Sequence, residues 1–136
     1  MTCVWNALLN GLRKGEGGSS CPQLGSFASP RQLVNRLKER NRITPNMLWQ
    51  GQPLRDQELK ENFEWIRDYN ANGIGGGHLT SPCCPFFVLL GHLLGVRIIH
   101  NMSDHRGRTH RIVIEPRSTR VRYDIVVHSS GGHMTG

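Results

Sequence analysis

The sequence of 136 residues contains no apolar run long enough to cross a membrane. Its most apolar segment, residues 85–94, is about half of the roughly 20 residues that a membrane-spanning helix needs. No basic flank precedes the first apolar residues, so the pattern of a secretory signal peptide is missing as well. We therefore expect no membrane span. The mass of 15.3 kDa predicts a single domain over residues 1–136, long enough to bury a core of its own.

Cysteine is scarce, and its spacing does not resemble that of a secreted disulfide scaffold. The four cysteines are Cys3, Cys21, Cys83 and Cys84. Because adjacent cysteines make a poor disulfide framework, we expect a reducing compartment, namely the cytoplasm of the cell or of a host cell. A zinc site built from Cys83, Cys84, His78 and His92 is disfavoured, since adjacent cysteines rarely ligate one ion and no Cys-x-x-Cys pair occurs. We expect neither a metal nor a cofactor.

Acidic residues are few: 10 Asp and Glu stand against 17 Lys and Arg, which gives a formal net charge of +7. The excess lies mainly in residues 31–42 and 106–122. Such a surplus suits nucleic acid, an acidic membrane surface or an acidic protein, but it also describes a solvated face. The patches at 106–111 and 117–122 lack the interleaved aromatic residues of a platform for single-stranded nucleic acid. Nucleic-acid binding through these patches is therefore an alternative and not the main expectation.

The spacing of apolar residues predicts helices first and strands last. Helices are expected from residue 4 to the glycines at 11–18, from Pro30 after an N-cap at Ser29, over 59–70, and from Pro82 to Gly95. Short β-rich runs follow at 96–99, 112–114 and 121–127. This order is typical of an α+β domain whose N-terminal helices pack on a small, mainly antiparallel C-terminal sheet. The loop at 75–78 is glycine-rich but has no Gly-Lys-Ser/Thr ending, so it does not predict a nucleotide site.

The first dozen residues hold the leading candidate for chemistry. Val4, Ala7, Leu8 and Leu12 mark one face of a helix, which places Cys3 at or just before the helix N-terminus. The unpaired N–H groups and the dipole at that point favour a thiolate. At the other end of the chain, Gly131 and Gly132 lead from the last predicted strand to His133. The sequence therefore offers a cysteine nucleophile and a histidine base, while a small apolar cysteine at a helix end is the simpler interpretation.

Three motifs together resemble a known family. They are Cys-x-x-Asn-Ala-Leu at residues 3–8, Leu-Leu-Gly-Val-Arg-Ile-Ile at 93–99, and Gly-Gly-His-Met at 131–134. Their order is similar to that of papain-like cysteine peptidases, and more narrowly to the ovarian-tumour (OTU) type, including its viral members. The resemblance implies that Cys3 is the nucleophile and contributes its N–H to the oxyanion hole. It also implies that His133 is the general base and that the activity needs no metal.

The third member of the catalytic site follows less directly from the resemblance. The family places an Asn or Asp two residues after the histidine, where this sequence has Thr135, and Asp124 or Asp104 is an alternative. Met134 stands where the family usually has an aromatic residue. The Asp-Gly-Asn stretch that precedes the family's cysteine is also missing, which leads us to expect a fragment of a longer polyprotein.

The resemblance implies a thiol-dependent hydrolase that cleaves a peptide or isopeptide bond. The family's usual substrate is a conjugate of ubiquitin or of a ubiquitin-like protein, so the expected activity is that of a deubiquitinase. A related alternative is a viral leader-type protease that cuts its own polyprotein. An alternative from another class is an inactive basic module of the same fold that binds RNA or protein. The sequence makes no prediction of oligomeric state.

Overall fold

The structure is a computed structural model that describes residues 3–69, 83–104, 106–118, 120–130 and 133–135. Its helices are α1 (Cys3–Glu16), α2 (Pro30–Glu39), α3 (Asp56–Asp68) and α4 (Cys83–Leu94). Two short strands, β1 (Ser20–Cys21) and β2 (Gly25–Ser26), form a separate hairpin. The others are β3 (Met47–Trp49), β4 (Gln52–Pro53), β5 (Arg97–Ser103), β6 (Thr109–Pro116), β7 (Asp124–Ser130) and β8 (His133–Thr135). The protein is therefore α+β, as the sequence predicts.

Local sequence explains where α2 and α4 begin or end. The Ser29 hydroxyl accepts a hydrogen bond from the Gln32 N–H at 3.2 Å, and Pro30 occupies the first helical position. The Gln32 side chain accepts a hydrogen bond from the N–H of Ala28, just before the helix. At the end of α4, Gly95 has a φ of 67° and donates to Gly91. This left-handed conformation stops the helix and turns the chain directly into β5.

Six strands form one mixed sheet in the order β4-β3-β6-β5-β7-β8. All neighbouring pairs are antiparallel except β5 and β7, which run parallel with Ile98 opposite Ile125. The hairpin of β7 and β8 places His133 opposite Ser130 and Thr135 opposite His128. The last two strands of the chain, β7 and β8, thus lie at one edge of the sheet, and β3 and β4 lie at the other.

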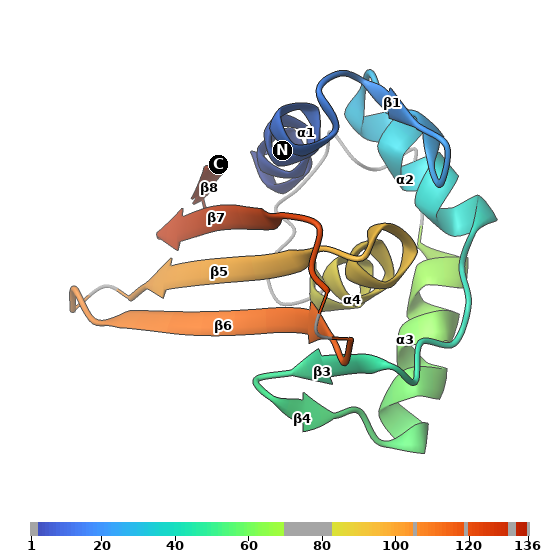
Figure 1. Ribbon diagram of the computed structural model, residues 1–136. Coiled ribbons are helices and arrows are strands. Elements are labelled where there is room, and N and C mark those ends of the chain that lie inside the picture. The colour runs from blue at the N-terminus through green and yellow to red at the C-terminus, as the bar shows by residue number, and fades with distance from the viewer. Residues whose placement is uncertain (1–2, 70–82, 105, 119, 131–132, 136) are drawn as a thin grey trace.

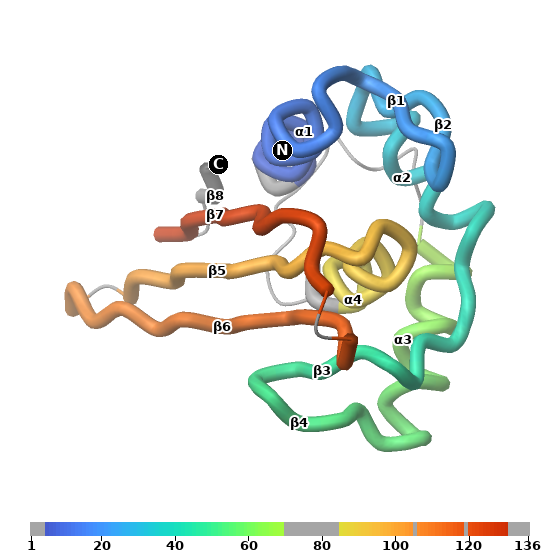
Figure 2. Tube along the Cα trace, in the orientation of Figure 1, coloured from blue at the N-terminus to red at the C-terminus, as the bar shows by residue number. Residues whose placement is uncertain are grey.

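The helices cover one face of this sheet. Figures 1 and 2 show α1 along the β7 side and α4 across the strands near β3 and β6, with α2 and α3 outside them. Leu8 and Leu12 of α1 share one core with Phe87 of α4 and with Ile98 and Val127 of the sheet. On the opposite face Asp124, Val126 and His128 are exposed. No described helix is long and apolar enough to cross a membrane.

The sheet extends beyond the three predicted strands. Residues 101–103 continue β5 and residues 115–116 continue β6, because the long β5–β6 hairpin pairs through Ser103 and Thr109. Residues 47–49, for which no strand was predicted, form β3 and pair with β6. The parallel β5–β7 pair was not expected. The predicted loop at 75–78 and the predicted start of α4 at 81–82 lie outside the described residues.

Candidate functional site

Two glycines let α1 lie directly against β7. A Cβ on Gly11 would lie 2.6 Å from Cγ2 of Ile125, and a Cβ on Gly15 would lie 2.1 Å from Cε2 of Tyr123. Helix α1 therefore runs antiparallel to β7, because Gly15 comes after Gly11 in the sequence while Tyr123 comes before Ile125. Bare Cα atoms at these two positions are what allows the close approach.

This alignment fixes where α1 begins relative to the sheet. Cys3 lies eight residues before Gly11, which is about 12 Å along a helix. Ser129 lies four residues after Ile125, about 13 Å along a strand. The beginning of α1 is consequently level with Ser129, whose partner in the β7–β8 hairpin is Met134.

The structure brings together the two elements that begin with the predicted catalytic residues. Helix α1 begins at Cys3 and strand β8 begins at His133. The two elements are in contact and lie side by side in both views of Figures 1 and 2. The backbone positions of Cys3 and His133 are thus at the same end of the sheet, although they are separated by nearly the whole sequence.

Both ends of α1 are anchored. Near its beginning, the buried Trp5 ring packs edge-on against Phe86 of α4 at 4.8 Å between centroids, and it also faces Tyr69 after α3. At its end, the Glu16 carboxylate accepts hydrogen bonds from Arg122 and from the Tyr123 hydroxyl. These contacts hold the helix in place at two points about 16 Å apart.

The cluster around Glu16 is an ion pair between a buried carboxylate and a partly exposed guanidinium. The Glu16 side chain is only 5% exposed, and Arg122 approaches it to 3.0 Å. Burial opposes ionisation of Glu16, yet the hydrogen bonds from Arg122 and Tyr123 outweigh it and lower the pKa of the carboxyl. Burial and the bond to Glu16 raise the pKa of Tyr123. Arg122 also donates to the Leu94 carbonyl at 3.1 Å, so one guanidinium joins the ends of α1 and α4.

A buried histidine lies in the same region and was not singled out by the sequence. The His100 ring is 7% exposed, stands edge-on to Phe87, and has its Nε2 2.7 Å from the Ser129 hydroxyl. Burial lowers the pKa of His100, and His128 lowers it further. His100 is therefore neutral at pH 7, held in the layer between α4 and the end of β7. Among the seven histidines, the sequence signal that could have found it is its place directly after Ile98 and Ile99.

The three candidates for the third catalytic position lie in different places. Asp124 precedes Ser130 by six residues, about 20 Å along β7, and forms an ion pair with Arg97 at 2.9 Å. Asp104 follows Ser103, which lies in register with Ser130, so it is at the same end of the sheet as His133. Its carboxylate accepts from the N–H groups of Arg106 and Arg108. Thr135 lies in β8 itself, which leaves Thr135 and Asp104 as the nearer candidates.

Cys21 and His92 do not offer a rival site. Cys21 is buried, and burial raises the pKa of its thiol, which disfavours the thiolate. His92 is half-buried in α4 with a lowered pKa for the same reason. The described residues contain no group of three or more His, Cys, Asp and Glu able to hold a metal ion. His78 lies outside the described residues.

Comparison of the chain with protein-family models, with curated proteins and with solved structures finds no match.

Proposed function

We propose that the protein is a cysteine peptidase of the OTU type, with Cys3 as nucleophile and His133 as general base. One observation carries the proposal: the helix that begins at Cys3 and the strand that begins at His133 are in contact at the same end of the sheet. Thr135 or Asp104 would orient the imidazole. We leave Asp124 out of the proposed site because about 20 Å of β7 separates it from the residue opposite His133.

The chemistry would use each group in its ordinary role. The imidazole accepts the proton of the Cys3 thiol, and the thiolate adds to the acyl carbon of the substrate. N–H groups at the beginning of α1 stabilise the oxyanion, where one such donor is typically worth about 3 kcal/mol. The imidazolium then gives its proton to the leaving amine, and water hydrolyses the thioester. A conjugate of ubiquitin or of a ubiquitin-like protein is the proposed substrate.

Labelling with ubiquitin that carries a C-terminal electrophile tests the proposal. The wild-type protein is expected to form a covalent adduct, and mass spectrometry is expected to locate it on Cys3. Cys3→Ala should abolish the adduct, while Cys21→Ala should retain it because that thiol is buried. His133→Ala should slow labelling strongly, whereas His128→Ala, which removes an exposed histidine from the neighbouring strand, should not.

Folding of each variant would be checked by circular dichroism. Labelling that persists in Cys3→Ala, or equal loss in His133→Ala and His128→Ala, would rule out the assignment. The folded wild-type protein could instead form no adduct but cleave a peptide from its own polyprotein through Cys3. This result would support the proposed cysteine chemistry and would show that the substrate is the polyprotein and not a ubiquitin conjugate.

A second candidate function has one specific observation in its favour. The β5–β6 hairpin projects beyond the rest of the sheet in Figure 1, and Arg106, Arg108 and Arg111 near its tip are exposed. This arrangement suits a phosphate backbone, so RNA binding is the alternative role. RNA affinity that falls steeply with salt, in a protein whose Cys3 is unreactive, would favour it.

A further inference from the structure

Negative charge is concentrated on one helix of this basic protein. Helix α3 carries Asp56, Glu58, Glu61, Glu64 and Asp68, which is five of the chain's 10 acidic residues. Asp56 and Glu58 lie in the first turn, where the helix dipole and the capping interactions with Arg55 account for them. Asp68 lies at the opposite end, where the dipole disfavours a carboxylate. The helix dipole therefore does not account for Asp68.

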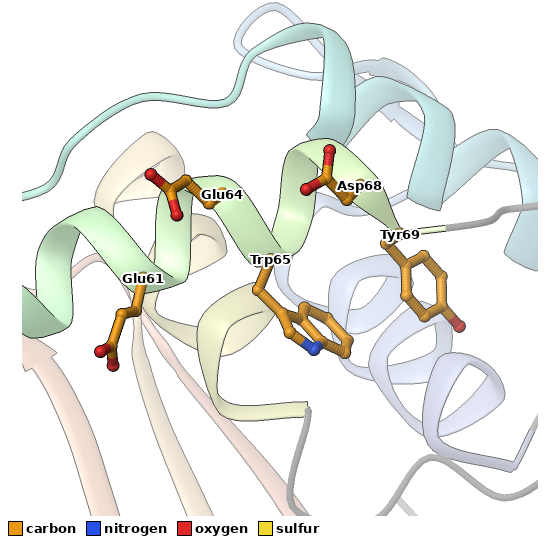
Figure 3. A pocket seen from close by; sticks show the side chains of 5 residues that line it. All are labelled: Glu61, Glu64, Trp65, Asp68 and Tyr69. Carbon is orange, nitrogen blue, oxygen red and sulfur yellow. The ribbon is translucent and has the colours of Figure 1, made fainter.

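Acidic residues of α3 border a groove whose floor is aromatic. The α3 groove, as we call it, has a volume of about 470 Å³ and is lined by Glu61, Glu64, Trp65, Asp68 and Tyr69. Figure 3 shows the Glu61 side chain and the two rings on one side of α3, and the Glu64 and Asp68 carboxylates on the other side of the helix. The ring centroids of Trp65 and Tyr69 are 5.1 Å apart, and both residues are only partly buried. The groove thus combines two partly exposed aromatic residues with the Glu61 carboxylate on the same side of α3.

A second hollow continues the first along the helix. It has a volume of about 260 Å³, shares Glu61 with the α3 groove, and includes Leu54, Val88 and Trp49, whose side chain is 39% exposed. Two partly exposed tryptophans therefore lie along one path with Glu61 between them. Two adjoining hollows along one helix suit an extended segment better than a small molecule.

The charges along the path are only partly neutralised. Asp68 is paired with Arg67 at 2.9 Å, and Glu58 is paired with Arg55 at 3.1 Å. Glu61 accepts a hydrogen bond from the neutral Gln57 side chain at 2.8 Å, so its charge is not balanced there. Glu61 consequently keeps its negative charge near Trp65, while Glu64 interacts electrostatically with Arg67.

We propose that the α3 groove docks an extended, arginine-bearing segment of a protein partner. A guanidinium stacks on an indole or phenol face and donates to carboxylates at the same time, which an ammonium does less well. The net charge of +7 would repel a basic segment from the rest of the protein, so docking is confined to this acidic surface. The proposal does not depend on Cys3 being a nucleophile.

Binding of a hexa-arginine peptide to the full chain at physiological salt tests the proposal. In two-dimensional NMR spectra, the indole N–H signal of Trp65 is expected to shift on addition of this peptide and to remain still with hexa-citrulline. Hexa-lysine should bind more weakly than hexa-arginine. Glu64→Lys should weaken hexa-arginine binding about five- to tenfold, as expected for one local charge reversal.

Glu39→Lys is the matched control, because it raises the net charge by the same amount at an exposed position on α2. It should bind hexa-arginine nearly as well as the wild type. Equal weakening by Glu64→Lys and Glu39→Lys would overturn the proposal, since only the overall charge would then matter. No shift of Trp65 would overturn it too.

A second copy of the chain is the other occupant to test, since its β5–β6 hairpin carries arginines. Sedimentation of the protein alone is expected to give the same mass for the wild type and for Glu64→Lys. A dimer that Glu64→Lys dissociates would overturn the proposal of a separate partner. Labelling of Cys3 by the ubiquitin probe is expected to be unchanged in Glu64→Lys when the probe is saturating, which separates this test from that of the peptidase.

Discussion

Gly11 of α1 lies so close to Ile125 of β7 that a Cβ on the glycine would be 2.6 Å from the isoleucine Cγ2. Ile125 is 1% exposed and belongs to the common core, so it has little room to move away. This contact and the one between Gly15 and Tyr123 fix the position of α1 along the direction of β7. The position of Cys3 relative to β8 depends on it.

Gly11→Ala is expected to destabilise the protein by about 1–3 kcal/mol through overpacking, even though alanine is the better helix former by about 1 kcal/mol. Gly18→Ala is the control, because a Cβ there would meet nothing within 4 Å. It should change stability by less than about 0.5 kcal/mol. Chemical denaturation of the two variants checks the prediction, and equal stability would contradict the close contact.

The ion pair between Arg122 and Glu16 is expected to contribute to stability. Arg122→Ala would leave the Glu16 carboxylate buried without its main partner and would free the Leu94 carbonyl. We expect a loss of about 1–3 kcal/mol, less than for a fully buried pair because Arg122 is 43% exposed. Arg120→Ala removes a neighbouring exposed arginine and should be nearly neutral. Thermal unfolding that does not distinguish the two variants would contradict this account.

The buried His100 predicts how stability changes with pH. Its folded-state pKa is lowered, so the unfolded chain binds more protons once the pH falls below about 6.5. The His100 contribution should therefore be fully present above about pH 7.5 and be lost progressively as the pH falls through and below about 6.5 toward the lowered folded-state pKa, and His92 acts in the same direction. The pKa of Glu16 is lowered from 4.5, so its effect belongs to more acidic pH.

His100→Gln retains a partner for the Ser129 hydroxyl but removes the titrating ring. The free energy of unfolding of this variant should depend less on pH over that range than that of the wild type. His128→Gln, at an exposed position, is the control and should retain most of the wild-type dependence. An identical pH profile for His100→Gln and the wild type would show that His100 is not the group responsible.

Local signals predicted the helices well, while contacts between distant segments escaped prediction. The Ser29 cap and Pro30 mark the beginning of α2, and Leu33, Val34 and Leu37 form its buried stripe as expected. Gly11 and Gly15, by contrast, indicated a helix end, because glycine is a poor helix former. Tertiary packing against β7 overrides that preference and extends α1 to Glu16.

In the sheet, too, local sequence predicted the strands but not how distant strands pair. The apolar runs at 96–99, 112–114 and 121–127 predicted three of its strands, but not that β5 and β7 would pair in parallel, since strand order depends on segments far apart in sequence. For the candidate site, the sequence predicted a helix beginning near Cys3, and the structure confirms that element. The catalytic roles of Cys3, His133 and Thr135 stay predictions.

The ionisation of Cys3 is the most direct test of the proposed peptidase. The rate of alkylation of each cysteine by iodoacetamide would be followed against pH, with mass spectrometry to separate the peptides. We expect Cys3 to react with a pKa well below the ordinary value of about 8.5, and the pH dependence to change in His133→Ala but not in His128→Ala. A Cys3 that titrates as an ordinary thiol, with the same profile in His133→Ala, would contradict the Cys3–His133 pair.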